Sequence, residues 1–190
     1  MTILDTFRGR PRNHRDDGTW ETTRKQGPFR RLTLRRTDGR VYLDRWGIGS
    51  DRLGAIMLHR MQAPDPGVDL HDHPWFFVSI VLRGGYFELR ASTREAADMA
   101  REAAAGLRSR NGHRVARYPF TVKTMRLDEC HTITDLIAGD CWTLVIRGPR
   151  RRRWGFYLAD GWMAEADYDA TVRAHRRDLW SDQNEEARPW

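Results

Sequence analysis

Short runs of apolar residues, separated by turn residues, fill the middle of the chain. The runs are four to eight residues long, the usual length of β-strands, and Gly, Pro, Asn and Asp mark the breaks between them. About ten strands are predicted, at 31–36, 41–46, 54–61, 76–82, 86–90, 113–118, 121–127, 131–136, 141–147 and 154–158. Many short strands at regular spacing indicate an all-β sandwich or barrel.

Two pairs of turn residues predict tight hairpins, Asp38-Gly39 and Gly84-Gly85. The segment 93–107 differs, because its alanines, Met99 and Leu107 recur at helical spacing with charges between them. We therefore predict a helical insertion near 93–108, which Asn111-Gly112 would end.

These patterns divide the chain into three parts. Residues 1–28 are polar and charged and are expected to form an arm that is partly disordered or lies on the surface. Residues 29–158 form the strand-rich barrel. Residues 159–190 are expected to form a short helix, over 164–179, and a tail.

The net charge of +7 invites a nucleic-acid interpretation, but composition argues against it. Lys25 and Lys123 are the two lysines among 33 basic residues, and the arginines are interleaved with 26 acidic residues. No apolar run approaches the roughly 20 residues of a membrane span, so we expect a cytoplasmic protein without a membrane partner. Cys130 and Cys141 cannot form a disulfide framework and are interpreted as small core residues.

The segment His71-Asp72-His73 carries the clearest chemical signal. On a strand, residues two apart point to the same face, so His71 and His73 can direct both imidazoles at one metal ion. Asp72, between them, is then expected to point away. A third ligand must come from elsewhere. His131 and His113 both open predicted strands, and His131 is favoured because its strand can start beside the other two histidines; His59 is a further, less favoured histidine.

At this point the chain resembles the cupin superfamily. The first cupin motif has His-x-His, three or four residues, Glu, six residues and Gly. Here His71-x-His73 is followed by three residues, Phe77 in place of the Glu, six residues and Gly84. The second motif centres on one His and is matched here by His131 alone. The resemblance implies a cupin-type β-sandwich barrel, or jelly roll, over about 29–158.

The resemblance also implies a metal held by His71, His73 and His131. Imidazole suits iron(II), zinc, nickel and manganese, so the ligands alone do not choose the metal. Three-histidine iron sites among cupins are similar to those of thiol dioxygenases, so the leading interpretation is an iron(II) dioxygenase acting on a small-molecule or peptide substrate. The alternatives are a cupin isomerase and a non-catalytic binding or regulatory module with a structural zinc or nickel site, which would form a homodimer through a sheet edge.

Several other residues are candidates for catalysis or substrate binding. Glu88, on the strand after Gly85, is a candidate to replace the missing carboxylate. Asp135 lies two steps along the strand face from His131 and is a candidate acid or base. Trp75 and Phe77 would line the barrel beside the metal, and Arg147 would bind an anionic substrate, so these three residues are the candidates for substrate binding.

Overall fold

A computed structural model of the chain describes residues 20–26, 29–35, 40–65, 69–106 and 112–168. Within these ranges the chain is mostly β-structure, with one helix, α1, of three turns and a further helical turn at 165–168. The elements are β1 (Trp20–Gln26), β2 (Phe29–Arg35), β3 (Val41–Ser50), β4 (Gly54–Met61), β5 (Phe77–Arg83), β6 (Tyr86–Ser92), α1 (Thr93–Ala104), β7 (His113–Arg117), β8 (Val122–Met125), β9 (Glu129–Leu136), β10 (Cys141–Arg147), β11 (Gly155–Leu158) and β12 (Gly161–Ala164).

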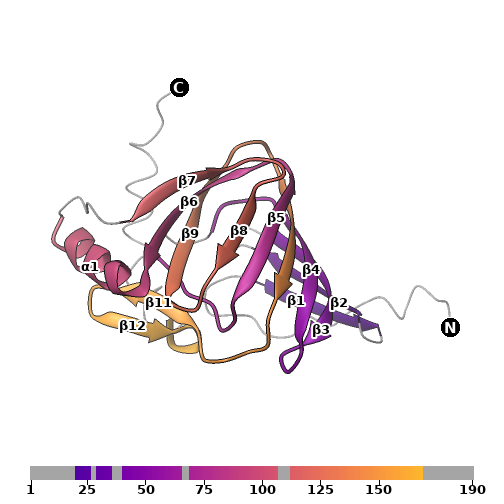
Figure 1. Ribbon diagram of the computed structural model, residues 1–190, viewed down its shortest axis with the longest axis horizontal. Coiled ribbons are helices and arrows are strands. Elements are labelled where there is room, and N and C mark those ends of the chain that lie inside the picture. The colour runs from indigo at the N-terminus through magenta and orange to yellow at the C-terminus, as the bar shows by residue number, and fades with distance from the viewer. Residues whose placement is uncertain (1–19, 27–28, 36–39, 66–68, 107–111, 169–190) are drawn as a thin grey trace.

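Two antiparallel sheets face each other and enclose the core (Figure 1). The larger sheet has the order β1-β2-β3-β4-β10-β5-β8, and the smaller has the order β7-β6-β9. Strands β11 and β12 form a separate hairpin beside α1. No ladder joins the two sheets within the described ranges, so hydrogen bonds do not close the barrel there. The predicted all-β sandwich with a helical insertion is confirmed.

Apolar side chains fill the space between the sheets at two levels. One cluster joins both sheets and contains Leu43, Met61, Val81, Tyr86, Ile133 and Cys141. A second lies on the concave face of the larger sheet and contains Met57, Phe77, Met125 and Val145. Burial raises the pKa of both the Cys130 and the Cys141 thiol to about 12, and both side chains are fully buried, as expected of core residues.

Helix α1 begins with a capping box. The Ser92 hydroxyl accepts a hydrogen bond from the Glu95 N–H, and the Glu95 carboxylate accepts one from the Ser92 N–H. Ala96 and Met99 pack against the protein. The helix ends at Ala104, ahead of the predicted Asn111-Gly112 stop, because Gly106 adopts a left-handed conformation that terminates it. No helix in the described ranges has the length and apolar character needed to cross a bilayer.

The hairpin predicted at Gly84-Gly85 is wrong. Strand β5 pairs with β10 and β8, whereas β6 pairs with β7 and β9, so this turn carries the chain from one sheet to the other. Gly84 has a positive φ, and a Cβ there would lie 2.1 Å from the Asp140 carbonyl oxygen. The two glycines therefore permit a close crossing between the sheets rather than a two-residue β-turn.

Both ends of the described chain add strands that the pattern did not predict. Strand β1 pairs along its whole length with β2, so regular structure is already present at Trp20, before Phe29, and the arm predicted over 1–28 contains a strand at the end of the described sheet. At the other end, β12 precedes the expected C-terminal helix. Residues 165–168 form one helical turn, and the rest of the range predicted for that helix lies outside the described residues. Strands β2 and β3 pair antiparallel, as expected of a hairpin, and the predicted turn at Asp38-Gly39 lies outside the described residues.

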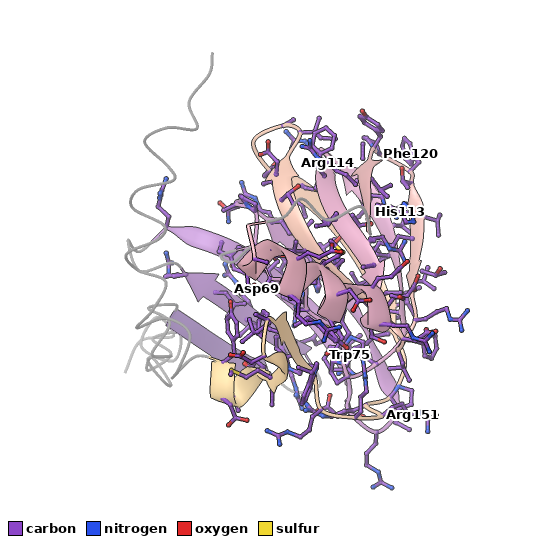
Figure 2. All side chains as sticks on the ribbon, turned by 90° about the vertical axis from the view of Figure 1, so that its left-hand side faces the viewer. Asp69, Trp75, His113, Arg114, Phe120 and Arg151 are labelled. Carbon is purple, nitrogen blue, oxygen red and sulfur yellow. The ribbon has the colours of Figure 1, made fainter. Side chains whose placement is uncertain are left out.

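The turn before β8 carries local backbone strain. Phe120 has a φ of +68° and is 81% exposed, at the opposite end of the molecule from Trp75 (Figure 2). The left-handed conformation costs an L-residue about 1–2 kcal/mol, and asparagine tolerates it better than phenylalanine does.

We expect Phe120→Asn to raise the free energy of unfolding by about 0.5–1 kcal/mol, because strain is relieved and little buried surface is lost. Urea unfolding followed by circular dichroism measures this change. Leu53→Asn is the control, because Leu53 is also an exposed apolar turn residue but has no positive φ. If the Phe120→Asn protein is no more stable than the Leu53→Asn protein, the left-handed conformation of Phe120 does not lower the stability of the protein.

Candidate metal centre

The His71–His73 segment is held by backbone contacts to two strands. His71 and His131 exchange both of their backbone N–H···O hydrogen bonds, each 2.9 Å long, and His71 also bridges Phe156 of β11. The segment is a loop with a single bridge at His71, and not the continuous strand that the i, i+2 argument assumed. The two imidazoles nevertheless converge, because β9 and β11 fix the loop on both sides.

The three histidine side chains form one compact group. One nitrogen of each lies within 4.8 Å of those of the other two, so His71, His73 and His131 could hold a metal ion. The Nε2 atoms of His73 and His131 are 2.9 Å apart. That distance is a hydrogen bond when one of these nitrogens carries the ring proton, so metal binding there requires this proton to leave.

Aromatic rings enclose the group. The Phe77 ring lies edge-on to His73, with centroids 4.9 Å apart. On the other side Trp154 and Phe156 lie 6.1 and 5.8 Å from the His71 ring. Phe77, which stands in place of the cupin glutamate, therefore contacts His73 with its ring and limits the space for water beside it.

The buried carboxylate of Glu88 forms a hydrogen bond with His131 Nδ1, the ring nitrogen that points away from the other two histidines. Glu88 Oε2 lies 2.9 Å from His131 Nδ1, and Glu88 also accepts hydrogen bonds from Lys123 and, at 2.8 Å, from Arg117 Nε. Lys123 Nζ in turn lies 2.9 Å from His131 Nδ1. Glu88 does not replace the missing metal ligand, because it meets the far side of the imidazole. It orients His131 and fixes the Nδ1–H tautomer, which leaves Nε2 free for a metal.

The electrostatics of this group favour neutral imidazoles. Burial lowers the pKa of His71 and His73, and burial together with the Lys123 charge lowers the pKa of His131 to about 3. Burial also lowers the pKa of Lys123 to about 8, against the opposing effect of Glu88. Although burial raises the pKa of Glu88, Lys123 and His131 reverse this and hold it well below its usual range. At neutral pH the histidines are therefore in the form that binds metals.

Asp72 points away from the three imidazoles, as predicted, and anchors the β11–β12 hairpin. It is fully buried, and its carboxylate accepts hydrogen bonds from the Gly155 N–H at 2.8 Å and from Trp162 Nε1 at 3.1 Å. It also pairs with Arg152 at 2.9 Å. Arg152 Nε donates to the His73 carbonyl oxygen at 3.3 Å. Arg152 therefore links the carboxylate of Asp72 to the backbone of the histidine segment.

Two predicted site residues lie away from the centre. Asp135 is exposed, and its carboxylate accepts a hydrogen bond from the neighbouring Leu136 N–H. A β-bulge shifts the register between β6 and β9, so that Phe87 faces Asp135 whereas Glu88 faces Ile133. The face shared by positions 131 and 133 therefore does not continue to 135. His113 is exposed on β7 and does not join the group, so of the two candidates His131 is the one that the fold brings there.

The predicted substrate-binding residues lie at one end of the sandwich. Phe77 contacts His73, and the Arg147 guanidinium lies 4.1 Å from the Trp75 ring centroid. Arg147 also pairs with Asp51 at 2.9 Å. The Arg147 guanidinium therefore already contacts an aromatic ring and a carboxylate. Substrate binding by Trp75, Phe77 and Arg147 stays a prediction.

The sequence analysis assigned no role at the site to Lys123 and Arg45. Lys123 is buried against Glu88 and His131, and Arg45 faces the interior from β3, opposite His59. The sequence does distinguish Lys123, because a lysine is rare in a chain whose basic residues are otherwise almost all arginine. Nothing in the sequence distinguishes Arg45 from the many other arginines.

Comparisons with known proteins find no matching family model and no matching curated protein. The chain is similar to a solved cupin 2 conserved barrel domain protein from Rhodopseudomonas palustris, with 13% identity, a TM-score of 0.45 and coverage of 76% of this chain and 81% of that one. It is also similar to the Fe(II) form of HppE, with 10% identity, a TM-score of 0.44 and coverage of 62% and 56%. An oxalate decarboxylase matches with 12% identity, a TM-score of 0.40 and coverage of 60% and 28%. The chain spans just over half of the HppE chain.

Proposed function

We propose that the protein is an iron(II)-dependent oxygenase that acts on a small-molecule or peptide substrate, with His71, His73 and His131 as the metal ligands. One observation carries the proposal. The three imidazoles converge, and no fourth His, Cys, Asp or Glu joins them among the described residues. Structural zinc sites take four protein ligands, whereas catalytic sites keep positions for substrate and water. A three-ligand centre therefore favours catalysis over a structural metal.

The protein's own residues prepare the centre for this chemistry. When bound, iron(II) would bind and activate O₂ and hold the substrate that is oxidised. The neutral imidazoles need not lose a positive charge before binding the metal, and Glu88 keeps the His131 proton on Nδ1. Phe77, Trp154 and Phe156 restrict water around the ligands. Such a dry site suits the protection of a reactive intermediate from solvent.

Metal content is the test of this proposal. We expect near-stoichiometric iron, by plasma mass spectrometry, in protein from cells grown without added metal. The His71→Ala/His73→Ala variant should lose it, because the remaining imidazole cannot hold the metal alone. The matched control is His113→Ala, which removes an exposed histidine outside the group and should keep its iron.

The identity of the metal decides between the proposed reaction and its competitors. Iron in the wild type, with O₂ consumption that the double variant lacks, would support the oxygenase. Zinc or nickel, also lost in the double variant, would contradict iron chemistry and favour isomerisation or a binding role. No metal in the wild type, even after reconstitution, would overturn the metal-dependent function.

A further inference from the structure

A polar row crosses the interior of the sandwich between the two apolar clusters. Arg45 of β3 lies opposite His59 of β4, and His59 lies opposite Thr143 of β10. Residues two positions away on each strand share the same face. On one side these are Leu43, Met61 and Cys141, and on the other they are Gly47, Met57 and Val145. Arg45 and His59 therefore lie on the concave face at mid-depth, inside a core that is otherwise largely apolar.

This polar row lies close to the three-histidine centre. Burial, and after it the charge of Arg45, hold the pKa of His59 well below its usual range. Two positions along β4 and β10 from His59 and Thr143, Met57 and Val145 pack with Phe77 in one cluster. The Phe77 ring in turn lies edge-on to His73, with centroids 4.9 Å apart. The polar row therefore lies next to the cluster that contacts His73.

His59 has an incomplete set of hydrogen bonds. Its Nε2 atom is buried and has no hydrogen-bond partner among the described residues. Buried polar atoms in folded proteins are nearly always paired, so an orphaned one indicates a ligand or an ordered water. A neutral imidazole that carries its proton on Nε2 donates one hydrogen bond, and Thr143, buried beside it, offers a hydroxyl donor.

We propose that Arg45 and His59 bind the carboxylate of an organic-acid substrate whose other end lies at the three-histidine centre. A guanidinium supplies paired N–H donors that match a carboxylate, and the His59 N–H adds a third donor to the same group. Burial of the anion inside the sandwich is then compensated by a full positive charge. The inference rests on the proposed function, because it places the substrate of that same centre.

Anion binding to metal-free, chelator-treated protein tests the inference. Malonate and benzoate are titrated as carboxylate probes, with inorganic phosphate as a tetrahedral anion and chloride at equal ionic strength as the reference. We expect saturable binding of the carboxylates, read from the histidine ¹⁵N resonances and from thermal unfolding. Arg45→Gln and His59→Gln should each weaken it on the order of 10-fold or more, since each removes a hydrogen bond to a charged group.

Arg60→Gln is the matched control. Arg60 follows His59 directly in the chain but lies on the opposite face of β4, where it pairs with Asp140 at 2.9 Å. This variant should bind the probes like the wild type. Equal weakening in Arg60→Gln, no saturable carboxylate binding in the wild type, or tighter binding of phosphate than of both carboxylates would overturn the inference. Should Arg45→Gln fail to fold, the wild-type His59 resonance, assigned with His59→Gln, still reports binding.

The experiment separates this inference from the proposed function. Carboxylate binding that depends on Arg45, in a protein that takes up no metal, would support the anion site and reject the oxygenase. A stoichiometric metal that depends on His73, without any carboxylate binding, would reject the anion site and leave the metal-dependent function standing.

Discussion

Glu88→Ala is expected to lower the free energy of unfolding by about 3–5 kcal/mol, because it leaves buried charges without their counter-ion. The Lys123 and Arg117 side chains are 3% and 12% exposed, and both donate to the Glu88 carboxylate. Without it, neither cation regains its hydration in the folded state. Urea unfolding of the metal-free protein, followed by circular dichroism, measures this loss.

The same substitution should weaken metal binding by about 10- to 100-fold, because His131 loses the carboxylate that fixes its orientation and tautomer. A competition titration with a chromogenic chelator measures the affinity. Glu129→Ala is the control, since Glu129 pairs with Arg90 in a more exposed position, and it should cost at most about 1 kcal/mol. Equal losses in the two variants would contradict the structural role of Glu88.

In the double variant Glu88→Ala/Lys123→Met, part of the lost stability should return, because the uncompensated ammonium is removed along with the carboxylate. Metal affinity should stay low, because His131 is still without its hydrogen-bond acceptor. This split between recovered stability and unrecovered affinity distinguishes orientation of His131 from a purely structural ion pair.

Asp72→Ala is expected to have a comparable effect on stability, about 3–5 kcal/mol. The substitution removes one fully buried carboxylate that serves Arg152, the Gly155 N–H and Trp162. The β11–β12 hairpin then loses its attachment to the histidine segment. Thermal and urea unfolding measure the stability, and chelator competition measures the metal affinity, which should fall because Arg152 also holds the His73 carbonyl.

The exposed pair of Asp128 and Arg126 provides the reference for Asp72. Asp128→Ala removes a solvated carboxylate and should change stability by no more than about 0.5 kcal/mol. Asp72→Asn should be intermediate, since it keeps one acceptor oxygen but loses the charge that Arg152 requires. If Asp72→Ala unfolds at the same urea concentration as Asp128→Ala, the carboxylate does not anchor the hairpin.

The sequence alone predicted most strands and the helix correctly, because these depend on local patterns. The alternation in 54–61 and 141–147 reappears in the structure as β4 and β10, two neighbouring strands of the larger sheet. The helical spacing after Ser92 likewise gives α1. The spacing of His71, His73 and Gly84 identified the segment that holds two of the three converging histidines.

Which strands pair, and which face of a strand points inward, depended on the tertiary structure. The sequence Gly84-Gly85 is typical of a tight β-hairpin, yet the strands on either side of it, β5 and β6, belong to different sheets. The bulge in β9 turns Asp135 outward although counting by two from His131 places it inside. A single extra residue cannot be seen in the hydrophobic pattern, because exposed and buried positions near strand ends look alike.

The sequence by itself determined a strand-rich sandwich and its candidate metal ligands, two histidines on one short segment and a third available downstream. Only the tertiary structure decided that His131 and not His113 completes the group, and that Glu88 holds a ligand instead of being one. It also decided that Arg45 is the arginine that lies opposite His59 on the inner face of the larger sheet. The physical reason is that each of these roles arises from contacts between strands distant in sequence, which the pairing of the sheets creates and local pattern does not encode.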